Sequence, residues 1–193
     1  MGPLIILSGP SGSGKSTVLR RLLEPGDLPV RLSVSATTRP PRPGERDGVD
    51  YHFWTRERFE QEIREGAFLE WAQVHGNYYG TLRREVEPYR ARGTGVLLDI
   101  DVQGAAQVRS RCPDSYGIFL QAPSLEVLEQ RLRARGTESE EAIQRRLATA
   151  RRELEHVGAY QQVVVNDDLD RTVAALRQII QELCQRRGPC TTS

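Results

Sequence analysis

Short apolar runs recur along the chain, and amphipathic segments of helix length separate them. The runs that predict buried strands cover residues 4–7, 95–101, 116–121 and 162–165. Apolar residues at helical spacing predict a helix that begins near residue 15, and further helices over 125–135, 139–155 and 169–185. Strands separated by helices are typical of a parallel sheet with helices on both faces, so we expect an α/β core.

The stretch between residue 36 and about residue 92 breaks this alternation. An alternating segment at 30–35 predicts a strand that leads into it, and an irregular segment with three prolines follows at 37–48. The remainder predicts a helix at 56–65, a strand at 68–74, a turn at 76–77 and a helix at 82–92. We therefore expect an inserted mixed α/β lobe over 36–93. The arginine-rich helical pair over 125–155 predicts a second, smaller insertion, which leaves 1–35, 94–124 and 156–193 as the core.

The composition is typical of a soluble globular protein, because 38% of the 193 residues are hydrophobic and 27% are charged. This length suits one core with insertions better than two large domains. No apolar run approaches the roughly 18 residues of a membrane span, and the N-terminus lacks the pattern of a secretory signal. The three cysteines show no metal-ligand spacing, so we expect unreactive thiols, no membrane partner and a cytoplasmic location.

Positive and negative charges nearly cancel, with 27 basic and 26 acidic residues and a net charge of +1. A general nucleic-acid surface needs a larger basic excess, so we expect no nucleic-acid partner. Of the 27 basic residues, 26 are arginines and one, Lys15, is a lysine. Genomic composition contributes to such a bias, but it still draws attention to the position of the one lysine.

That lysine lies in a glycine-rich segment between the first predicted strand and the first predicted helix. The segment reads Gly9-Pro10-Ser11-Gly12-Ser13-Gly14-Lys15-Ser16, with Thr17 next. It matches the GxxxxGK[ST] phosphate-binding pattern in the required strand-to-helix context. Small residues allow backbone N–H groups to face phosphate oxygens, Lys15 can reach the β- and γ-phosphates, and the Ser16 hydroxyl can bind Mg²⁺. The segment predicts a nucleoside triphosphate site, but it does not separate a kinase from an ATPase or GTPase.

A second candidate phosphate site lies on the proline-rich segment. Arg39 and Arg42 are three residues apart, and the surrounding prolines restrict the conformations of the backbone. Two guanidinium groups that the backbone holds in a preorganised arrangement suit a phosphate group. Tyr51 and Tyr79 could add hydroxyl donors to the same phosphate. On these residues alone, an ordinary solvated polar loop remains the alternative.

Taken together, these segments resemble the guanylate kinases in order and spacing, over roughly residues 3–185. Besides the phosphate loop, the matching segments are Ser33-Val34-Ser35, Thr37 to Gly44, Asp50-Tyr51, Phe68 to Ala72, Gly76 to Gly80, Leu98 to Gly104, Arg135 to Glu138, and Asn166-Asp167. The resemblance implies a P-loop three-layer α/β fold with a mainly parallel core sheet, a GMP-binding lobe and a small helical lid. It also implies transfer of the γ-phosphoryl group of ATP to GMP, with Mg²⁺, giving ADP and GDP.

The resemblance also implies how the acceptor base is chosen. Guanine presents N1–H and its 2-amino group side by side, and Glu70 occupies the position of the carboxylate that accepts from both. Ser35 and Thr81 match positions whose hydroxyls face the base, and Asp101 matches a residue that faces the monophosphate nucleotide. Adenine would turn an acceptor nitrogen toward Glu70, and each unpaired buried polar group costs about 1–3 kcal/mol. The acceptor is therefore expected to be GMP, with dGMP as a further candidate.

Further residues are expected to act on the transferred phosphoryl group. Arg131, Arg135 and Arg146 match arginines of the family's lid, and Asn166 matches the residue beside the adenine. With Lys15 and Arg39, these arginines would stabilise the moving charge, because phosphoryl transfer depends mainly on positioning and electrostatics. Asp99 ends a buried strand beside the phosphate loop, where ligands bind in open α/β sheets, and could orient a Mg²⁺-bound water. The division of roles between Asp99 and Asp101 stays open.

Three alternative functions remain to be weighed. Guanylate-kinase-like domains also serve as non-catalytic interaction modules, but such a module is expected to lose Lys15 or the lid arginines. A kinase of another phosphorylated small molecule, such as a sugar phosphate, is disfavoured by Glu70 together with Ser35 and Thr81. A nucleic-acid-dependent ATPase fits poorly with the net charge of +1. We expect a monomer, with a small homo-oligomer as the alternative.

Overall fold

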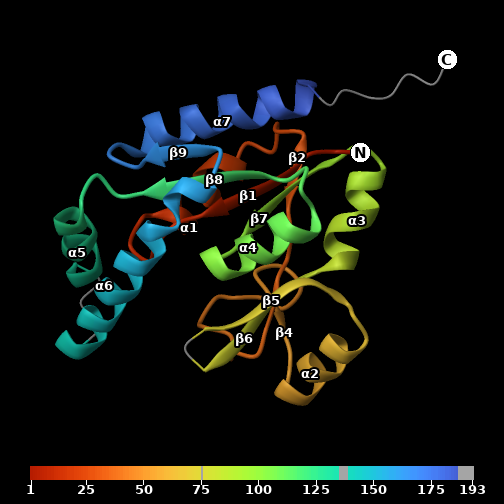
Figure 1. Ribbon diagram of the computed structural model, residues 1–193, viewed down its shortest axis with the longest axis horizontal. Helices are drawn as coiled ribbons and strands as arrows, with labels where there is room; N and C mark the ends of the chain where they lie inside the picture. Colours follow the sequence, from red (N-terminus) through yellow and green to blue (C-terminus); the bar gives the residue numbers. More distant parts are fainter. Residues whose placement is uncertain (75, 135–138, 187–193) are drawn as a thin grey trace.

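The computed structural model describes residues 1–74, 76–134 and 139–186. Its core is a five-stranded sheet in the order β2-β7-β1-β8-β9, and every neighbouring pair in it is parallel (Figure 1). The strands are β1 (Leu4–Ser8), β2 (Val30–Leu32), β7 (Gly95–Asp99), β8 (Tyr116–Gln121) and β9 (Gln162–Val165). The expected parallel core sheet is confirmed.

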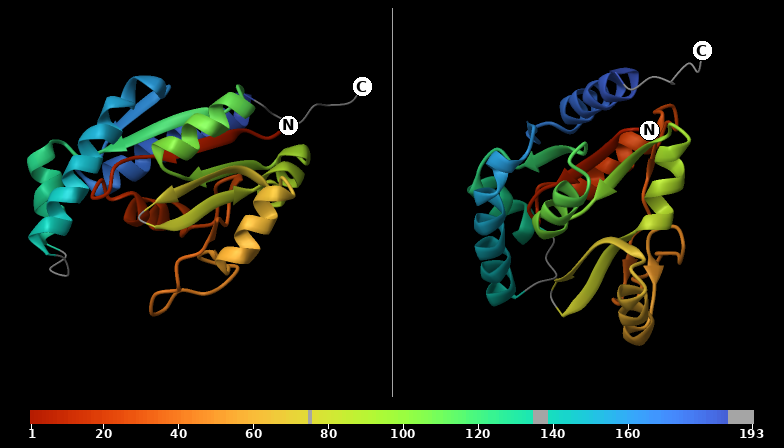
Figure 2. Two further views of the ribbon diagram at one scale, coloured as in Figure 1. Left: turned by 60° about the horizontal axis from the view of Figure 1, so that its bottom comes forward. Right: turned by 45° about the vertical axis from the view of Figure 1, so that its right-hand side comes forward.

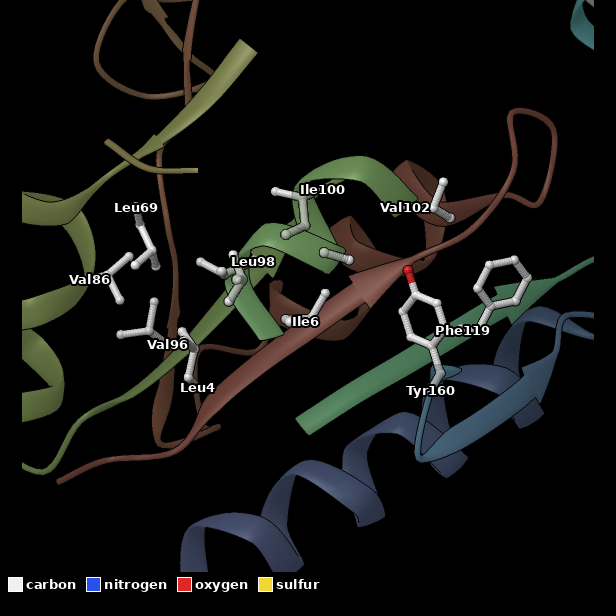
Figure 3. Close-up of a cluster of buried hydrophobic side chains, with 12 residues drawn as sticks. Leu4, Ile6, Leu69, Val86, Val96, Leu98, Ile100, Val102, Phe119 and Tyr160 are labelled. Atoms are coloured by element: carbon white, nitrogen blue, oxygen red, sulfur yellow. The ribbon is translucent and has the colours of Figure 1, made fainter. Parts of the chain in front are cut away.

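The three inner strands, β1, β7 and β8, bury both of their faces, as strands inside a parallel sheet covered by helices must. Ile5 and Leu7 of β1 pack with α1 (Lys15–Leu23) and α7 (Leu169–Arg186) on one side. Leu4 and Ile6 pack on the other side with Val96 and Leu98 of β7, beneath α4 (Val102–Arg111) and α3 (Arg83–Ala91) (Figure 3). Because side chains alternate along a strand, one four-residue apolar run supplies both halves of the core.

Helix α4 was absent from the sequence-based prediction. Small residues such as Gly104 and Ala105 make up much of its buried face, so its apolar stripe is weak. What begins the helix is Asp101, whose carboxylate accepts a hydrogen bond from the backbone N–H of Gly104 at 2.8 Å. The predicted strand at 95–101 therefore ends at Asp99, and the second acid is a helix cap rather than a strand residue.

The second sheet has four strands in the order β4-β3-β6-β5 and lies within the predicted lobe. Its strands are β3 (Ala36–Thr37), β4 (His52–Phe53), β5 (Phe68–Val74) and β6 (Asn77–Leu82), and α2 (Arg56–Arg64) packs beside them. The β3–β4 pair is parallel, whereas β3–β6 and β5–β6 are antiparallel. The sheet has an apolar cluster of its own, formed by Ala36, Trp54, Phe59, Phe68 and Leu82. The mixed α/β character of this region is thus confirmed, while the limits 36–93 stay a prediction.

The strand predicted at 30–35 is confirmed only over Val30–Leu32, because the chain leaves the core sheet after that and enters the second sheet at Ala36. Val30–Leu32 pairs with β7 in the core, and the N–H of Ser33 still donates to the carbonyl of Leu97 at 2.9 Å. Ala36 instead pairs with His52 and Gly80 in the second sheet. Alternation along the sequence cannot show where a chain leaves one sheet and enters another.

The helical pair predicted near 125–155 consists of α5 (Leu125–Arg133) and α6 (Glu140–Glu155). Its members share a small apolar cluster that contains Leu128, Leu132, Ile143 and Leu147. Ser139 caps α6 by accepting from the N–H of Ala142. A short 3₁₀ turn, Val157–Ala159, then leads to β9. The pair lies at one end of the core sheet, on a different side from the second sheet (Figure 2).

In the described part of the chain, no helix is both long enough and apolar enough to cross a bilayer.

Candidate active site

The glycine-rich loop follows β1 directly, and α1 begins at its lysine. Gly14 has a φ of 91°, a left-handed conformation that favours glycine, and no side chain caps the helix that follows it. A Cβ atom at Gly9 would lie 2.1 Å from the carbonyl oxygen of Leu120, so only glycine allows β1 and β8 to approach so closely there. The uncapped helix N-terminus at this loop is an anion-binding feature.

Two predicted site residues, Arg131 of the catalytic set and Asn166 of the ATP-binding set, hold the loop by its backbone. The side-chain amide of Asn166 donates to the carbonyl of Ser13 at 2.7 Å. The guanidinium of Arg131 donates to the carbonyl of Asn166 at 2.8 Å and to that of Ser13 at 3.4 Å. These contacts fix the shape of the loop from the side of β9 and α5. The roles predicted for Arg131 and Asn166 toward ATP itself stay predictions.

A cavity of roughly 360 Å³ opens in front of the loop. Most of the predicted site residues line it: Gly9, Pro10, Ser11, Gly12, Gly14, Lys15, Ser16, Thr17, Ser35, Tyr51, Glu70, Tyr79, Asp99, Asp101 and Arg146. The predicted residues that do not line it are Ser13, Arg39, Arg42, Thr81, Arg131 and Asn166. Arg135 lies outside the described residues. Segments far apart in the sequence, from the loop, the second sheet, the end of β7 and α6, thus meet around one space.

Lys15 and Asp99 form an ion pair at the floor of this cavity, with 2.7 Å between Nζ and Oδ1. Burial disfavours the charged form of Lys15, but the adjacent carboxylate of Asp99 outweighs it, so the pKa of Lys15 is raised. The lysine is therefore a cation over the whole physiological pH range, as a group that binds phosphate must be. Neither side chain is fully enclosed, since Lys15 retains 19% of its side-chain exposure and Asp99 retains 30%.

Glu70 is a buried carboxyl group on β5, in the part of the cavity lining that comes from the second sheet. It is 3% exposed, and the Thr81 hydroxyl donates to its Oε1 at 2.6 Å. Burial raises the pKa of Glu70 to about 7, against the hydrogen bond from Thr81, and the negative charge of Asp101 adds to the rise. Within the described part of the chain, Glu70 makes no ion pair. A buried carboxyl without a cation is costly unless a ligand supplies hydrogen-bond donors.

The position of Glu70 follows from the packing of β5 against α4. The Gln107 side chain bonds both backbone groups of Trp71, donating to its carbonyl at 2.7 Å and accepting from its N–H at 3.4 Å. Arg111 donates to the carbonyl of Leu69, and the Leu69 side chain enters the core cluster (Figure 3). A Cβ atom at Gly104 would lie 2.5 Å from Oε2 of Glu70, so the glycine leaves room for the carboxylate.

Glu153 is a cavity residue that the sequence-based analysis missed. It lies on α6, two turns after Arg146, and its carboxylate interacts with the backbone N–H of Ser11. Arg146 donates to the Ser11 hydroxyl at 2.6 Å, so both side chains hold α6 against the phosphate loop. Burial raises the pKa of Glu153 to about 7, although Lys15 opposes this. The i, i+7 spacing from Arg146 was the available signal, because it places both residues on one helix face.

The second candidate phosphate site is only partly assembled at the cavity. Tyr51 and Tyr79 line it with their rings edge to face, 6.1 Å between centroids. Arg39 lies behind them, and Glu45 forms an ion pair with it at 2.9 Å. The side chain of Arg42 is exposed, and its backbone N–H donates to Glu45 at 2.6 Å. The structure therefore brings Arg39 toward the tyrosines and leaves Arg42 at the surface.

Comparison with known proteins gives one consistent family. The family model described as guanylate kinase matches residues 1–183. The guanylate kinase of Idiomarina loihiensis is 50% identical over 188 residues, which cover 97% of this chain and 89% of the relative. That of Symbiobacterium thermophilum is 54% identical over 181 residues, covering 93% and 84%. The crystal structure of guanylate kinase from Anaplasma phagocytophilum superposes with a TM-score of 0.77 at 36% identity, covering 94% of this chain and 85% of that one. The chain therefore belongs to the guanylate kinase family, the nucleoside monophosphate kinases that transfer a phosphoryl group from ATP to GMP.

Proposed function

We propose that ATP and GMP meet in the cavity described above, with the donor phosphates on the glycine-rich loop and the guanine against Glu70. The observation that carries this proposal is that Lys15 and Glu70 line the same cavity. A phosphate-binding cation at the start of α1 and a buried carboxyl of raised pKa on β5 thus face one space. Such an arrangement suits two nucleotides bound end to end, with their phosphates in the middle.

Glu70 would select the base because its carboxylate can only accept hydrogen bonds and therefore favours a base that presents N–H donors. An ionised Glu70 accepts from N1–H and from the 2-amino group of guanine, while Thr81 continues to donate to Oε1. The 2.6 Å bond from Thr81 fixes the carboxylate plane, so little side-chain freedom is lost when the base binds. The Ser35 hydroxyl, which also lines the cavity, is available to O6. Adenine offers an acceptor where guanine offers N1–H and would leave the carboxylate unpaired.

The transfer step would depend on cations rather than on a protein base. The phosphate oxygen of GMP is already nucleophilic, so the protein needs only to align the two nucleotides and stabilise the moving charge. Lys15 lies on the cavity floor, and Arg146 reaches it from α6. We assign the same electrostatic role to Arg39, Arg131 and Arg135. Closure of the 36–93 lobe and the 125–155 lid over the core would exclude water during the step.

The cavity also fits a magnesium ion carried by ATP. Mg²⁺ is usually bound through one or two protein groups, several waters and the substrate phosphates. Ser16 in the first turn of α1 and Asp99 at the end of β7 both line the cavity. They would hold the Mg²⁺ ion, Asp99 through a water. Among the described residues no group of three or more acids, histidines or cysteines could hold a metal alone, which agrees with a metal that arrives with the nucleotide. When bound, Mg²⁺ neutralises part of the phosphate charge.

We further propose a monomer that acts in the cytoplasm on ATP and GMP, with dGMP as a second acceptor and no nucleic-acid or membrane partner. The near balance of charge supports the absence of a nucleic-acid surface. Lys15 and Arg146 are both present at the cavity, which disfavours a non-catalytic interaction module.

Replacing Arg39 by alanine is expected to raise KM for GMP by about 10- to 150-fold while changing KM for ATP little. The reason is the loss of a charge-assisted bond to the acceptor phosphate, which contributes about 1.5–3 kcal/mol. Steady-state kinetics with each substrate varied separately measure both constants. Arg83→Ala, which removes an arginine and its exposed ion pair with Glu87 on the surface of α3, is the control and should change neither. A defect confined to ATP would place Arg39 at the wrong end of the cavity.

A further inference from the structure

One edge of the Arg39 guanidinium, formed by Nη1 and Nη2, is already hydrogen-bonded within the protein. Nη1 and Nη2 donate to the two carboxylate oxygens of Glu45, each at 2.9 Å. Nη1 also donates to the carbonyl of Pro40 at 2.7 Å. Arg39 retains only 14% of its side-chain exposure and Glu45 retains 21%, so the pair is largely shielded from water. This is a two-point contact between planar groups, which fixes orientation as well as distance.

The N–H donors of Arg39 that these contacts do not use lie on a second edge of the guanidinium. A guanidinium carries five N–H donors, and the contacts with Glu45 and Pro40 use three of them. The donors that Glu45 and Pro40 do not use are Nε–H and one N–H of Nη2, which are neighbours on the remaining edge of the group. That edge suits two oxygens of one phosphate. The Tyr79 hydroxyl, which belongs to a cavity-lining residue, also interacts with the Arg39 guanidinium.

Glu45 also fixes the backbone that carries both arginines. Its Oε2 accepts from the N–H of Arg42 at 2.6 Å, and its own N–H donates to the carbonyl of Arg42 at 3.0 Å. The hydrogen bond from Arg39 holds the pKa of Glu45 below its usual value, although burial opposes this, so the carboxylate is ionised at neutral pH. One side chain therefore sets both the turn and the direction of the Arg39 edge.

We propose that Glu45 is a positioning residue for the acceptor phosphate. It binds the Nη1/Nη2 edge of Arg39 and so directs the Nε/Nη2 edge toward the phosphate of the nucleoside monophosphate. This inference rests on the proposed placement of that phosphate beside Tyr51, Tyr79 and Arg39. Glu45 and the phosphate occupy different edges of the guanidinium, so they bind it together and do not compete. The ordered edge avoids the loss of side-chain freedom that a mobile arginine would suffer on binding.

The test is a double-mutant cycle over Glu45→Gln and Arg39→Ala, with the dissociation constants of GMP and of guanosine measured by calorimetry. Gln at 45 keeps the size but loses one of the two acceptor oxygens and the charge. We expect Glu45→Gln to weaken GMP binding about tenfold and to leave guanosine binding and KM for ATP unchanged. In the Arg39→Ala background the same change should have no further effect. Glu87→Gln, which breaks the exposed pair with Arg83, is the matched control.

Each other outcome overturns the inference. Tighter GMP binding by Glu45→Gln would make Glu45 a competitor of the phosphate, and equal losses for GMP and guanosine would make it a purely structural residue. A further loss in the Arg39→Ala background would show that Glu45 acts independently of Arg39. If Arg39→Ala itself leaves GMP binding intact, the placement of the phosphate fails first, and that result is distinguishable from the others. Should Glu45→Gln not fold, Glu45→Asp keeps the charge, shortens the reach, and carries the same expectation.

Discussion

Replacing Lys15 by methionine is expected to lower kcat at least about 1,000-fold while the protein stays folded. Phosphoryl transfer is accelerated mainly by positive groups that stabilise the charge on the moving phosphoryl, and a single such group contributes about 10²–10⁵ in rate. Lys15 is the only lysine in the chain, and it lies on the cavity floor at the start of α1. Methionine keeps an unbranched apolar side chain, one atom shorter than that of lysine, and removes the charge together with its N–H donors.

The fold should survive because the partner of Lys15 is not trapped without solvent. Asp99 retains 30% of its side-chain exposure, so water can solvate the carboxylate when the lysine is absent. Thermal unfolding of the variant tests whether the fold survives. A rapid-quench measurement of a single turnover tests the loss of rate. Arg20→Met, on the exposed face of the same helix, is the control for loss of a cation and should turn over normally. Near-normal kcat in folded Lys15→Met protein would contradict the whole account of the loop.

Replacing Glu70 by glutamine is expected to lower kcat/KM for GMP by about 2–4 kcal/mol, or roughly 30- to 1,000-fold. The substitution keeps the size of the side chain but puts an NH₂ donor where guanine presents donors of its own. Adenine has an acceptor at N1 and tolerates that donor better, so the preference for GMP over AMP should shrink. KM for ATP should change little, since the donor phosphates are proposed to bind on the loop. An unchanged GMP-to-AMP preference would exclude Glu70 as the base-selecting group.

The same variant has an expected effect on the empty protein that depends on pH. Burial raises the pKa of Glu70 to about 7, so between about pH 4.5 and 7 the folded state binds this proton more strongly than the unfolded state. Ionisation of Glu70 therefore destabilises the fold as pH rises through this window, by up to about 3 kcal/mol. Glu70→Gln should raise Tm relative to the unaltered protein more at pH 8 than at pH 5. Glu65→Gln, at an exposed position, should show no such pH dependence.

The phosphate loop was predictable because everything that defines it is contiguous. An apolar run, glycines at the turn and a lysine at the helix start follow one another within twelve residues of the chain, and the structure places β1, the loop and α1 there. Glu70 is different, because the chain contains many acids, and only the resemblance to a family singled this one out. Its burial depends on the packing of β5 against α4 and on the space left by Gly104, and both come from a part of the chain far from Glu70.

Other features were missed because they arise only from tertiary packing. Glu153 enters the cavity because α6 packs across Ser11, and helical periodicity does not give the direction of that packing. Helix α4 has a buried face of small residues, so its pattern is faint although its cap, Asp101, is strong. Glu45 is six residues from Arg39 in an irregular loop, where no periodicity predicts which side chains meet.

The measurement that tests the central claim most directly is the rate of ADP formation with GMP, AMP, CMP and UMP as acceptors, at equal ATP and Mg²⁺ concentrations. A cavity that pairs a buried carboxylate with guanine donors predicts a kcat/KM for GMP at least about 1,000-fold above that for any of the other three. Comparable values for GMP and AMP would contradict the assignment of Glu70 as the residue that selects the base.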